Sequence, residues 1–419
     1  MPTPKRFFLE LFGSFKYCTI FTLCLNTIIP LIESTSTSSS HLLSMKKTSM
    51  KLAALAMFMC GSFTTIAQQI NVVTTAVPFL RITPDARSAG MGEVGIAISP
   101  DANSGFWNIA KTPFASNKMQ VGATYTPWLS DLKLNDVYMM NASGYYKLDD
   151  LQAVSAGVRY FSLGNIQFTD ANGNNLNSFR PREFAIEGGY SRKLSNKMGL
   201  GVALRYISSD LAGGTVGGVS YKKGTSVAGD VHYYYKGTNA NGNGFDYGVT
   251  LSNLGSKISY TNDATQKDYI PANLGIGAVY NKTMDADNKI SFGVDLNKLL
   301  VPTPPVGENG NPVTQQQIDD YRTKGVVSSW FSSLGDGDDI KEISVSAGAE
   351  YWYKNQFAFR VGYYGENKQK GDRRYFTVGT GLKYNNMGIN FAYLLPTGSG
   401  VTRNPLSNTL RFSVMYDMD

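Results

Sequence analysis

The sequence is dominated by segments of roughly ten residues in which apolar side chains alternate with small or charged ones. In GLGVALRY, which starts at Gly199, Leu200, Val202 and Leu204 alternate with glycine, alanine and arginine. A repeat of two residues is that of a β-strand, because successive side chains of a strand point to opposite faces. Each segment therefore predicts a strand with one apolar face and one polar face.

The alternation predicts about fourteen strands, and the connections between them are long and short in turn. The predicted strands lie at 118–127, 136–147, 152–163, 182–193, 198–209, 225–237, 244–253, 273–282, 289–299, 342–354, 356–365, 374–384, 386–395 and 408–417. Short turns on one side of a meander and longer loops on the other are typical of bacterial outer-membrane barrels. A soluble sandwich has no reason to keep that order.

We therefore predict an all-β fold, a 14-stranded antiparallel transmembrane barrel of the outer membrane over residues 118–419. In lipid every backbone amide must be paired internally, so a sheet spans only by closing on itself. Charged residues make up only 17% of the chain, while 25 tyrosines and 43 glycines suit strands that are apolar on one face. The alternative is a soluble β-barrel with tyrosine-rich strands.

The predicted strands place charged residues on the interior face and aromatic residues near the strand ends. The charges expected to line the lumen are Arg159, Glu187, Arg205, Asp230, His232, Asp246, Asp295 and Arg360. The aromatic residues expected in girdles at the lipid–water interface are Tyr125, Trp128, Tyr145, Tyr146, Tyr233–Tyr235, Tyr351–Tyr353, Tyr363, Tyr364 and Tyr416. Charges of both signs inside a barrel are expected to form paired networks, since an isolated buried charge is costly.

The N-terminal region is predicted to be a leader. Residues 45–67 follow the charged, apolar, small-residue order of a secretory signal peptide, with cleavage expected after Ala67. Residues 1–44 are interpreted as an over-long start. Without 1–67, which hold six Lys/Arg and two Asp/Glu, the formal net charge falls from +7 to +3, which gives no case for a nucleic-acid partner. All three cysteines also lie in the leader, so a mature chain has neither disulfides nor thiolate metal sites.

The stretch GMGEVGIAISPDANSGFWNIA, which begins at Gly90, contains the G-x-G-x-x-G pattern of dinucleotide-binding turns. That pattern binds a cofactor only between a buried strand and a helix. The residues before it are polar and interrupted by Pro84, and Pro100 stops any helix after it. No cofactor is therefore predicted. Because the stretch precedes the first strand, it is expected to enter the barrel from the periplasmic side.

This stretch resembles the N-terminal hatch of FadL-like outer-membrane barrels, in which a glycine-rich piece, an aspartate and an Asn-Pro-Ala triplet lie inside the barrel. The matching residues are Gly90, Gly92, Asp101, Asn108 and Ala110. Ile109 stands where the triplet has proline, so a looser turn is expected there. The resemblance implies a hatch segment at 68–117.

Two blocks of the chain, PFLRITPDARSAGMGEVGIAISPDANSGFWN and SVSAGAEYWYKNQFAFRVGYYGENKQKGDRRYFTVGTGLKY, resemble the PorV family of the type IX secretion system. The likeness extends over essentially all of the mature chain and is weakest in the loops at 164–181 and 210–240. It implies a non-enzymatic protein in outer-membrane lipid. Such a protein binds the C-terminal signal domain of cargo at an SprA-type translocon and carries it to surface attachment proteins of the PorU type.

The longest predicted loop, 300–341, carries apolar and aromatic residues at roughly helical spacing. A long loop with its own helix is often functional, although a helix that covers the barrel rim is an equal alternative. The residues expected to bind cargo or translocon are Tyr321, Trp330, Phe331 and Leu334.

Two further functions were weighed from the residues. His232, with Asp230 two residues before it, could act as the base of a lipid hydrolase if another strand brought in a serine; a polar lumen ladder is the commoner role. One histidine without cysteine supplies too few ligands for a metal. The alternative function is that of a FadL-type passive transporter of hydrophobic small molecules, although the Asn/Gly/Thr-rich loops suit protein contact at least as well.

Overall fold

The computed structural model describes residues 72–128, 134, 136–169, 172–212, 214–216, 219–263, 266–307, 312–335, 340–395 and 408–419. The predicted leader at 1–67, with its signal peptide at 45–67 and its over-long start at 1–44, lies outside the described residues.

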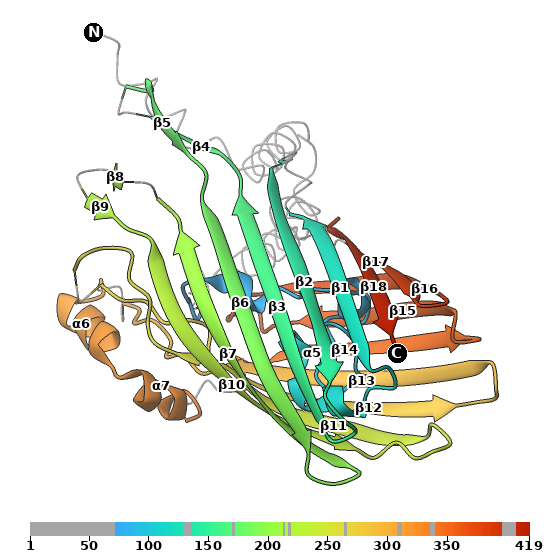
Figure 1. The fold of residues 1–419 in the computed structure, drawn as a ribbon. Coiled ribbons are helices and arrows are strands. Elements are labelled where there is room, and N and C mark those ends of the chain that lie inside the picture. Colours follow the sequence, from blue (N-terminus) through green and yellow to red (C-terminus); the bar gives the residue numbers. More distant parts are fainter. Residues whose placement is uncertain are drawn as a thin grey trace, which may run out of the picture. The chain divides into compact units, whose positions relative to one another are not determined.

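Fourteen antiparallel strands of the described chain close into a barrel, each paired with the next in the meander and the last with the first (Figure 1). They are β1 Met119–Pro127, β2 Val137–Lys147, β3 Gln152–Leu163, β6 Arg182–Lys193, β7 Met198–Asp210, β10 Gly224–Lys236, β11 Gly244–Gly255, β12 Asn273–Thr283, β13 Asn288–Leu299, β14 Ser344–Tyr353, β15 Phe357–Gly365, β16 Arg374–Tyr384, β17 Met387–Leu395 and β18 Leu410–Met418. The predicted fold class and strand number are confirmed, with strand ends within about two residues.

The alternation seen in the sequence becomes the two faces of the barrel wall. On β7, Val202 and Leu204 are 55% and 69% exposed on the outer face. Arg205, the next residue along the strand, is 3% exposed and faces the interior. Apolar side chains outside and polar ones inside are the arrangement that a lipid-spanning barrel requires. The lumen charges predicted from the sequence are buried, except Glu187, which is partly buried.

The connections define two ends of the barrel. Short turns such as 148–151, 194–197 and 284–287 lie at one end, which we call the short-turn end, and long connections lie at the other, the long-loop end. Two small hairpins in long connections were not predicted, β4 Ile166–Thr169 with β5 Asn175–Phe179 and β8 Gly214–Val216 with β9 Val219–Tyr221.

The predicted helix of the longest loop is two helices, α6 Gln315–Thr323 and α7 Val326–Ser332, which Figure 1 shows in orange. The chain breaks between them at Lys324 and Gly325, both in extended backbone geometry. Thr314 begins α6 with a capping box, since its side chain accepts from the Gln317 amide and the Gln317 side chain accepts from the Thr314 amide.

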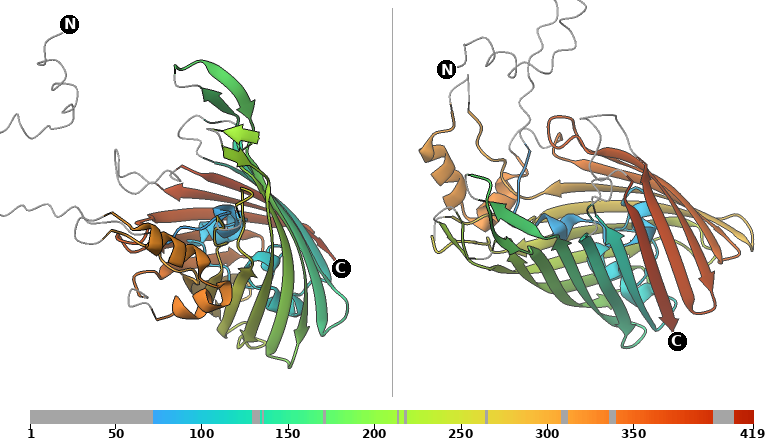
Figure 2. Two further views of the ribbon diagram at one scale, coloured as in Figure 1. Left: turned by 90° about the vertical axis from the view of Figure 1, so that its left-hand side faces the viewer. Right: turned by 90° about the horizontal axis from the view of Figure 1, so that it is seen from above.

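Four short elements precede the barrel in the chain: η1 Pro78–Arg81, α4 Ala86–Gly90, α5 Ser104–Trp107 and η2 Ile109–Phe114. Figure 2 shows them, in blue and cyan, surrounded by the strands. We call residues 78–114 the plug. Its helices contact the inner faces of strands on opposite sides of the barrel, with α4 against β15–β18 and η2 against β6, β7 and β10.

The aromatic prediction was wrong for three tyrosines and two tryptophans: Trp352 lines a cavity of the lumen, and Trp128 packs on Phe161 in the interior. Tyr145, Tyr234 and Tyr364 are 4%, 1% and 7% exposed and face the lumen, because each follows the parity of the inward-facing residues of its strand. Tyr125 and Tyr416 are exposed on the outer face, as expected for interfacial residues.

Within the described ranges, no helix has the length and apolar character needed to cross a membrane. No group of three or more His, Cys, Asp or Glu side chains among the described residues could hold a metal ion.

Gly362 on β15 tests how closely the plug packs against the wall. A Cβ atom at Gly362 would lie 2.1 Å from the Gly92 nitrogen and 2.2 Å from the Met91 carbonyl carbon, which are backbone atoms that cannot yield. Gly362→Ala is expected to lower the free energy of unfolding by about 1–3 kcal/mol, because overpacking forces the backbone apart. Thermal unfolding followed by circular dichroism in detergent measures the loss.

The matched control is Gly188→Ala on β6, where an added Cβ meets no atom within 4 Å. It should change stability by less than about 0.5 kcal/mol. Equal melting temperatures for the two variants would contradict the close packing of the plug.

Candidate functional site: the plug and the outer loop

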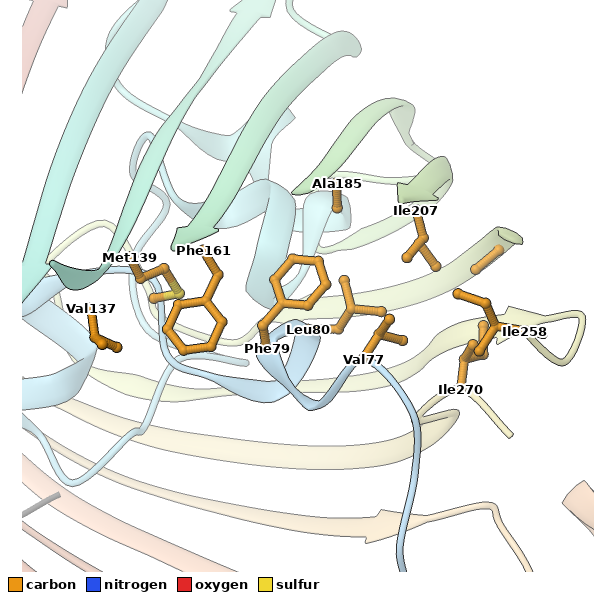
Figure 3. Packing of buried hydrophobic residues seen from close by; sticks show 11 residues of the cluster. Val77, Phe79, Leu80, Val137, Met139, Phe161, Ala185, Ile207, Ile258 and Ile270 are labelled. Carbon is orange, nitrogen blue, oxygen red and sulfur yellow. The ribbon is translucent and has the colours of Figure 1, made fainter. Parts of the chain in front are cut away.

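The plug runs the length of the lumen from the long-loop end to the short-turn end. Val77, Phe79 and Leu80 pack into an apolar cluster built from the long-loop ends of β2, β3, β6, β7 and β10 and from the connection at 256–272 (Figure 3). At the other end of the plug, Phe114 packs edge-to-face on Tyr234, near the short-turn end of β10. The described N-terminus of the plug therefore lies at the long-loop end, which corrects the expected entry from the short-turn side.

Gly90 and Gly92 let the plug pass close to the wall. Gly92 has a φ of 68°, in the left-handed region that favours glycine, and a Cβ there would lie 2.5 Å from the Tyr363 nitrogen. A Cβ at Gly90 would lie 3.0 Å from the Gly379 Cα. Among the described residues no helix begins between Gly92 and Asn103. The glycines of the G-x-G-x-x-G pattern thus serve a tight backbone passage.

One ion-pair network fixes α4 to the wall. Arg87 donates from Nη2 to Glu350 Oε1 at 2.7 Å and from Nη1 to Asp101 Oδ2 at 3.0 Å. Glu350 also accepts from Arg360 Nε at 2.7 Å, and all of these side chains are buried. One carboxylate thus neutralises a guanidinium of the plug and one of the wall. Buried charges of this kind are stable only when paired and hydrogen-bonded.

A second network crosses β3, β6, β7 and β10. Arg205 Nη2 lies 2.6 Å from Glu187 Oε2 and 2.9 Å from Asp230 Oδ2. Arg159 Nη2 lies 3.6 Å from the same Glu187 oxygen, and its Nη1 donates to the Leu80 carbonyl at 3.1 Å. Five of the eight predicted lumen charges therefore fall in two separate networks, Arg360 in the first and Arg159, Glu187, Arg205 and Asp230 in the second, and each network contacts the plug.

His232 holds the plug by its neutral ring. Its Nδ1 accepts from the Ile109 amide at 2.9 Å, so Nδ1 is bonded to backbone and not to a serine hydroxyl. The side chain of Asn108 donates to the Tyr233 carbonyl at 2.9 Å and accepts from the Ala110 amide. The turn at Ile109 is therefore held by hydrogen bonds to β10 and within the turn. Proline could not donate this hydrogen bond, since it has no N–H.

The centre of the plug is tied to β13 through Asp295. Asp295 Oδ2 accepts from the amides of Gly95 and Ile96 at 2.7 and 2.9 Å. Lys111, fully buried, donates from Nζ to the Gly95 carbonyl at 2.6 Å and ties two parts of the plug together. The sequence analysis placed Asp295 in the lumen but gave no sign of the role of Lys111.

The outer loop is held to the barrel at the junction of α6 and α7. Lys257 donates from Nζ to the carbonyls of Arg322 and Lys324 at 2.6 and 2.8 Å, and Tyr269 donates to the Lys324 carbonyl at 2.9 Å. The rings of Tyr269 and Tyr321 pack edge-to-face, with centroids 5.6 Å apart. Burial raises the pKa of Tyr321 to about 12. The connection at 256–272 thus positions both helices.

The four predicted binding residues of this loop do not share one face. Tyr321 is packed against the loop and Trp330 is half-buried, whereas Phe331 and Leu334 are 73% and 46% exposed. Val327, 57% exposed, completes a stripe at i, i+4 and i+7 with Phe331 and Leu334. We call these three residues the α7 stripe. Its spacing was visible in the sequence, but the choice of the larger aromatic residues overlooked Val327.

With the barrel, the plug and the outer loop described, the chain falls into the class of outer-membrane barrels whose lumen is filled by an N-terminal segment of the same chain. Residues 65–306, more than half of the chain, match the family described as "Type IX secretion system protein PorV". The chain belongs to this family. No curated protein matches it.

Solved structures similar to the chain include the Pseudomonas putida toluene transporter TodX, with 12% identity, 83% of this chain and 99% of that chain covered, and a TM-score of 0.49. A Pseudomonas aeruginosa FadL homologue has 12% identity, 83% and 100% coverage and a TM-score of 0.46. The Ralstonia pickettii toluene transporter TbuX has 12% identity, 80% and 98% coverage and a TM-score of 0.47.

Glu350→Gln tests whether the ion pairs hold the plug. The substitution leaves Arg87 and Arg360 without their shared negative charge, which is expected to cost about 3–5 kcal/mol, as for a broken buried pair. The reporter is Ser88→Cys on α4, because Ser88 is buried and its hydroxyl has no partner. Labelling of this cysteine by a water-soluble maleimide should become faster in the Glu350→Gln background.

The matched control is Asp372→Asn, which removes a partner of Arg374 in a pair whose side chains are 51% and 38% exposed. Pairs of this kind contribute at most about 1 kcal/mol, so labelling should stay slow. Labelling that is equally slow in the Glu350→Gln background would show that the plug is held by other contacts.

Glu342, in the connection before β14, gives a prediction of pH dependence. Burial alone would raise the pKa of its carboxyl, but hydrogen bonds from Lys298, Thr303 and Lys370 outweigh burial and lower it. A lowered pKa in the folded state means that the stabilisation is present above the ordinary glutamate pKa and is lost as the pH falls through the folded value. Hydrogen exchange of 340–343 should therefore be slow near neutral pH and faster in acid.

The Glu342→Gln variant should exchange fast at both pH values, after correction for the intrinsic exchange rate. A wild-type protection that does not change with pH would contradict this role of the carboxylate.

Proposed function

We propose that this PorV-family protein is the cargo-binding component of type IX secretion in the outer membrane. It binds the C-terminal signal domain of cargo at an SprA-type translocon and passes it to an attachment protein of the PorU type. Residues 45–67 direct its export, residues 68–117 form the hatch segment and the short-turn end faces the periplasm. The observation that carries the proposal is the α7 stripe at the long-loop end.

The α7 stripe has the character of a protein contact. Exposed apolar side chains at i, i+4 and i+7 are the anchors by which a helix packs into a groove of a partner. Val327 and Phe331 on α7, with Leu334 two residues beyond the end of the helix, are more than scattered exposure, which needs no explanation. The junction of α6 and α7 is tied down through Lys257 and Tyr269, so the stripe is presented in a fixed orientation. A preorganised helix loses less entropy on binding.

The lumen supports this function over passive transport. The apolar cluster at the long-loop end is filled by Val77, Phe79 and Leu80 of the chain itself, each at most 1% exposed. Below it, the plug is held by two ion-pair networks and by Asp295. A hydrophobic small molecule would have to displace these contacts to cross. Protein binding at the outer loop needs no such movement.

The test of the proposed function is the double variant Phe331→Ala, Leu334→Ala. It should reduce co-purification with the translocon and with a cargo signal domain about tenfold or more, because exposed aromatic anchors dominate such interfaces. In a deletion strain that carries this variant, proteins with a type IX signal domain should accumulate in the periplasm. Thermal unfolding should remain that of the wild type, since neither side chain is buried.

The matched control is Phe245→Ala on β11, an outer-face phenylalanine that is 63% exposed at the opposite end of the barrel. It should leave co-purification unchanged. Full recovery of the partners by the double variant would remove the α7 stripe from the interface. Normal secretion in the deletion strain, with only the uptake of a hydrophobic compound reduced, would replace the proposed function by transport.

A further inference from the structure

Inward-facing lysines surround the lumen at the short-turn end. Each occupies an inward position at the short-turn terminus of its strand, on β2, β6, β10, β13 and β16. The five residues, which we call the lysine ring, are Lys147, Lys193, Lys236, Lys289 and Lys383. Rings of lysine side chains at the mouth of a barrel attract anions, since the low-dielectric wall focuses their field.

Among the described residues, acidic side chains at this level lie within ion-pair distance of two lysines of the ring, Lys147 and Lys383. Asp246 is occupied by the wall, because its Oδ1 accepts from the amides of Gly237 and Thr238 and its Oδ2 accepts from Asn281. Asp417 pairs with Lys383 at 2.7 Å. The carboxylate of Asp150 lies 4.0 Å from Lys147 but is fully exposed, where such a pair contributes little.

Three lysines of the ring, and Lys282 beside them, line a cavity of about 460 Å³, which we call the vestibule. Lys236, Lys289 and Lys383 line it on the wall side, and Ser99, Pro100 and Phe114 of the plug line it on the other. Its remaining lining provides hydrogen-bonding groups and aromatic faces, including Ser116, Thr238, Asn281, Ser291, Asn355 and Trp352. Lys193 and Lys236 lie 5.0 and 6.0 Å from the centre of the Phe114 ring.

An unpartnered guanidinium nitrogen adjoins the vestibule. Arg360 is fully buried, and its Nη2 has no hydrogen-bond partner among the described residues. Its guanidinium lies 5.6 Å from the centre of the Trp352 ring and pairs with Glu350, and both of these residues line the vestibule. A buried donor left unsatisfied is costly, so this nitrogen indicates a polar ligand or ordered water beside it.

We propose that the lysine ring and the vestibule bind an acidic peptide segment that enters from the short-turn end. Several lysines spread around one mouth suit a chain of carboxylates better than a single anion, and the hydroxyl and amide groups can pair with a peptide backbone. A lipid headgroup does not fit, because the lining residues face the lumen and the wall separates them from the membrane. The inference rests on the proposed function only in assigning this end to the periplasm.

The test measures binding of a fluorescein-labelled Glu₆ peptide to the full-length protein in detergent by fluorescence anisotropy. Glu₆ should bind, the binding should weaken as salt rises, and a Gln₆ peptide should not bind. The double variant Lys236→Gln, Lys289→Gln should weaken Glu₆ binding about fivefold or more, since each exposed charge pair contributes a few tenths to one kcal/mol.

The matched control is Lys197→Gln, Lys354→Gln, which removes the same charge from exposed turns at the same end but outside the vestibule. It should change Glu₆ binding less than twofold. Equal weakening by both variants would mean nonspecific attraction, and absence of Glu₆ binding would overturn the proposal. Displacement of Glu₆ by equimolar inorganic phosphate would assign the site to a small anion instead. None of these outcomes depends on secretion or on the α7 stripe.

Discussion

The structure depends on the pairing of charges inside the barrel. An isolated ion in a low-dielectric interior is costly, so the charges that the wall directs inward must find partners. Arg360 of the wall and Arg87 of the plug share Glu350, while Arg159 and Arg205 share Glu187. The wall therefore carries charges that stabilise an occupied lumen, and the plug supplies the complementary groups. Without its plug, a barrel of this sequence would lose the Arg87–Glu350 ion pair and the Arg159–Leu80 hydrogen bond, although Arg360 and Arg205 would keep their partners on the wall.

The same interior explains how the chain departs from the pattern of the hatch that it resembles. Where that pattern has Asn-Pro-Ala, this chain has isoleucine, and the amide of Ile109 donates to His232. The buried histidine that invited a catalytic interpretation thus has a structural partner on the plug. The surfaces proposed to bind partners lie at the two ends, with an apolar helix face among the long loops and a basic vestibule among the short turns.

The barrel could be predicted from the sequence because a sheet in lipid has two strict requirements. Each strand must alternate apolar and polar side chains, and each backbone amide must be paired within a closed sheet. Strand positions, the interior charges and the glycine-rich passage follow from that constraint. The direction of the plug did not follow, because position before β1 does not say which end the chain comes from. Tyr145, Tyr234 and Tyr364 were wrongly assigned to the lipid interface because they lie near strand ends. The alternation of side chains along each strand places them on the inward face. Which side chains of the α7 stripe are exposed depends on which face of the helix packs against the protein. The anchoring by Lys257 and Tyr269 decides this, and the sequence does not show it.

The closing strands constrain how such a barrel can be assembled. The first and last strands pair along their length, and both also hold the plug: Gln120 of β1 accepts from the Ala102 amide and Ser413 of β18 accepts from the Ala86 amide. A segment that carries Trp107 and a helical turn on α4 is too bulky to be threaded afterwards through a sealed ring. The seam between β1 and β18 is thus bonded to the plug on both sides, so its closure and the seating of the plug are coupled.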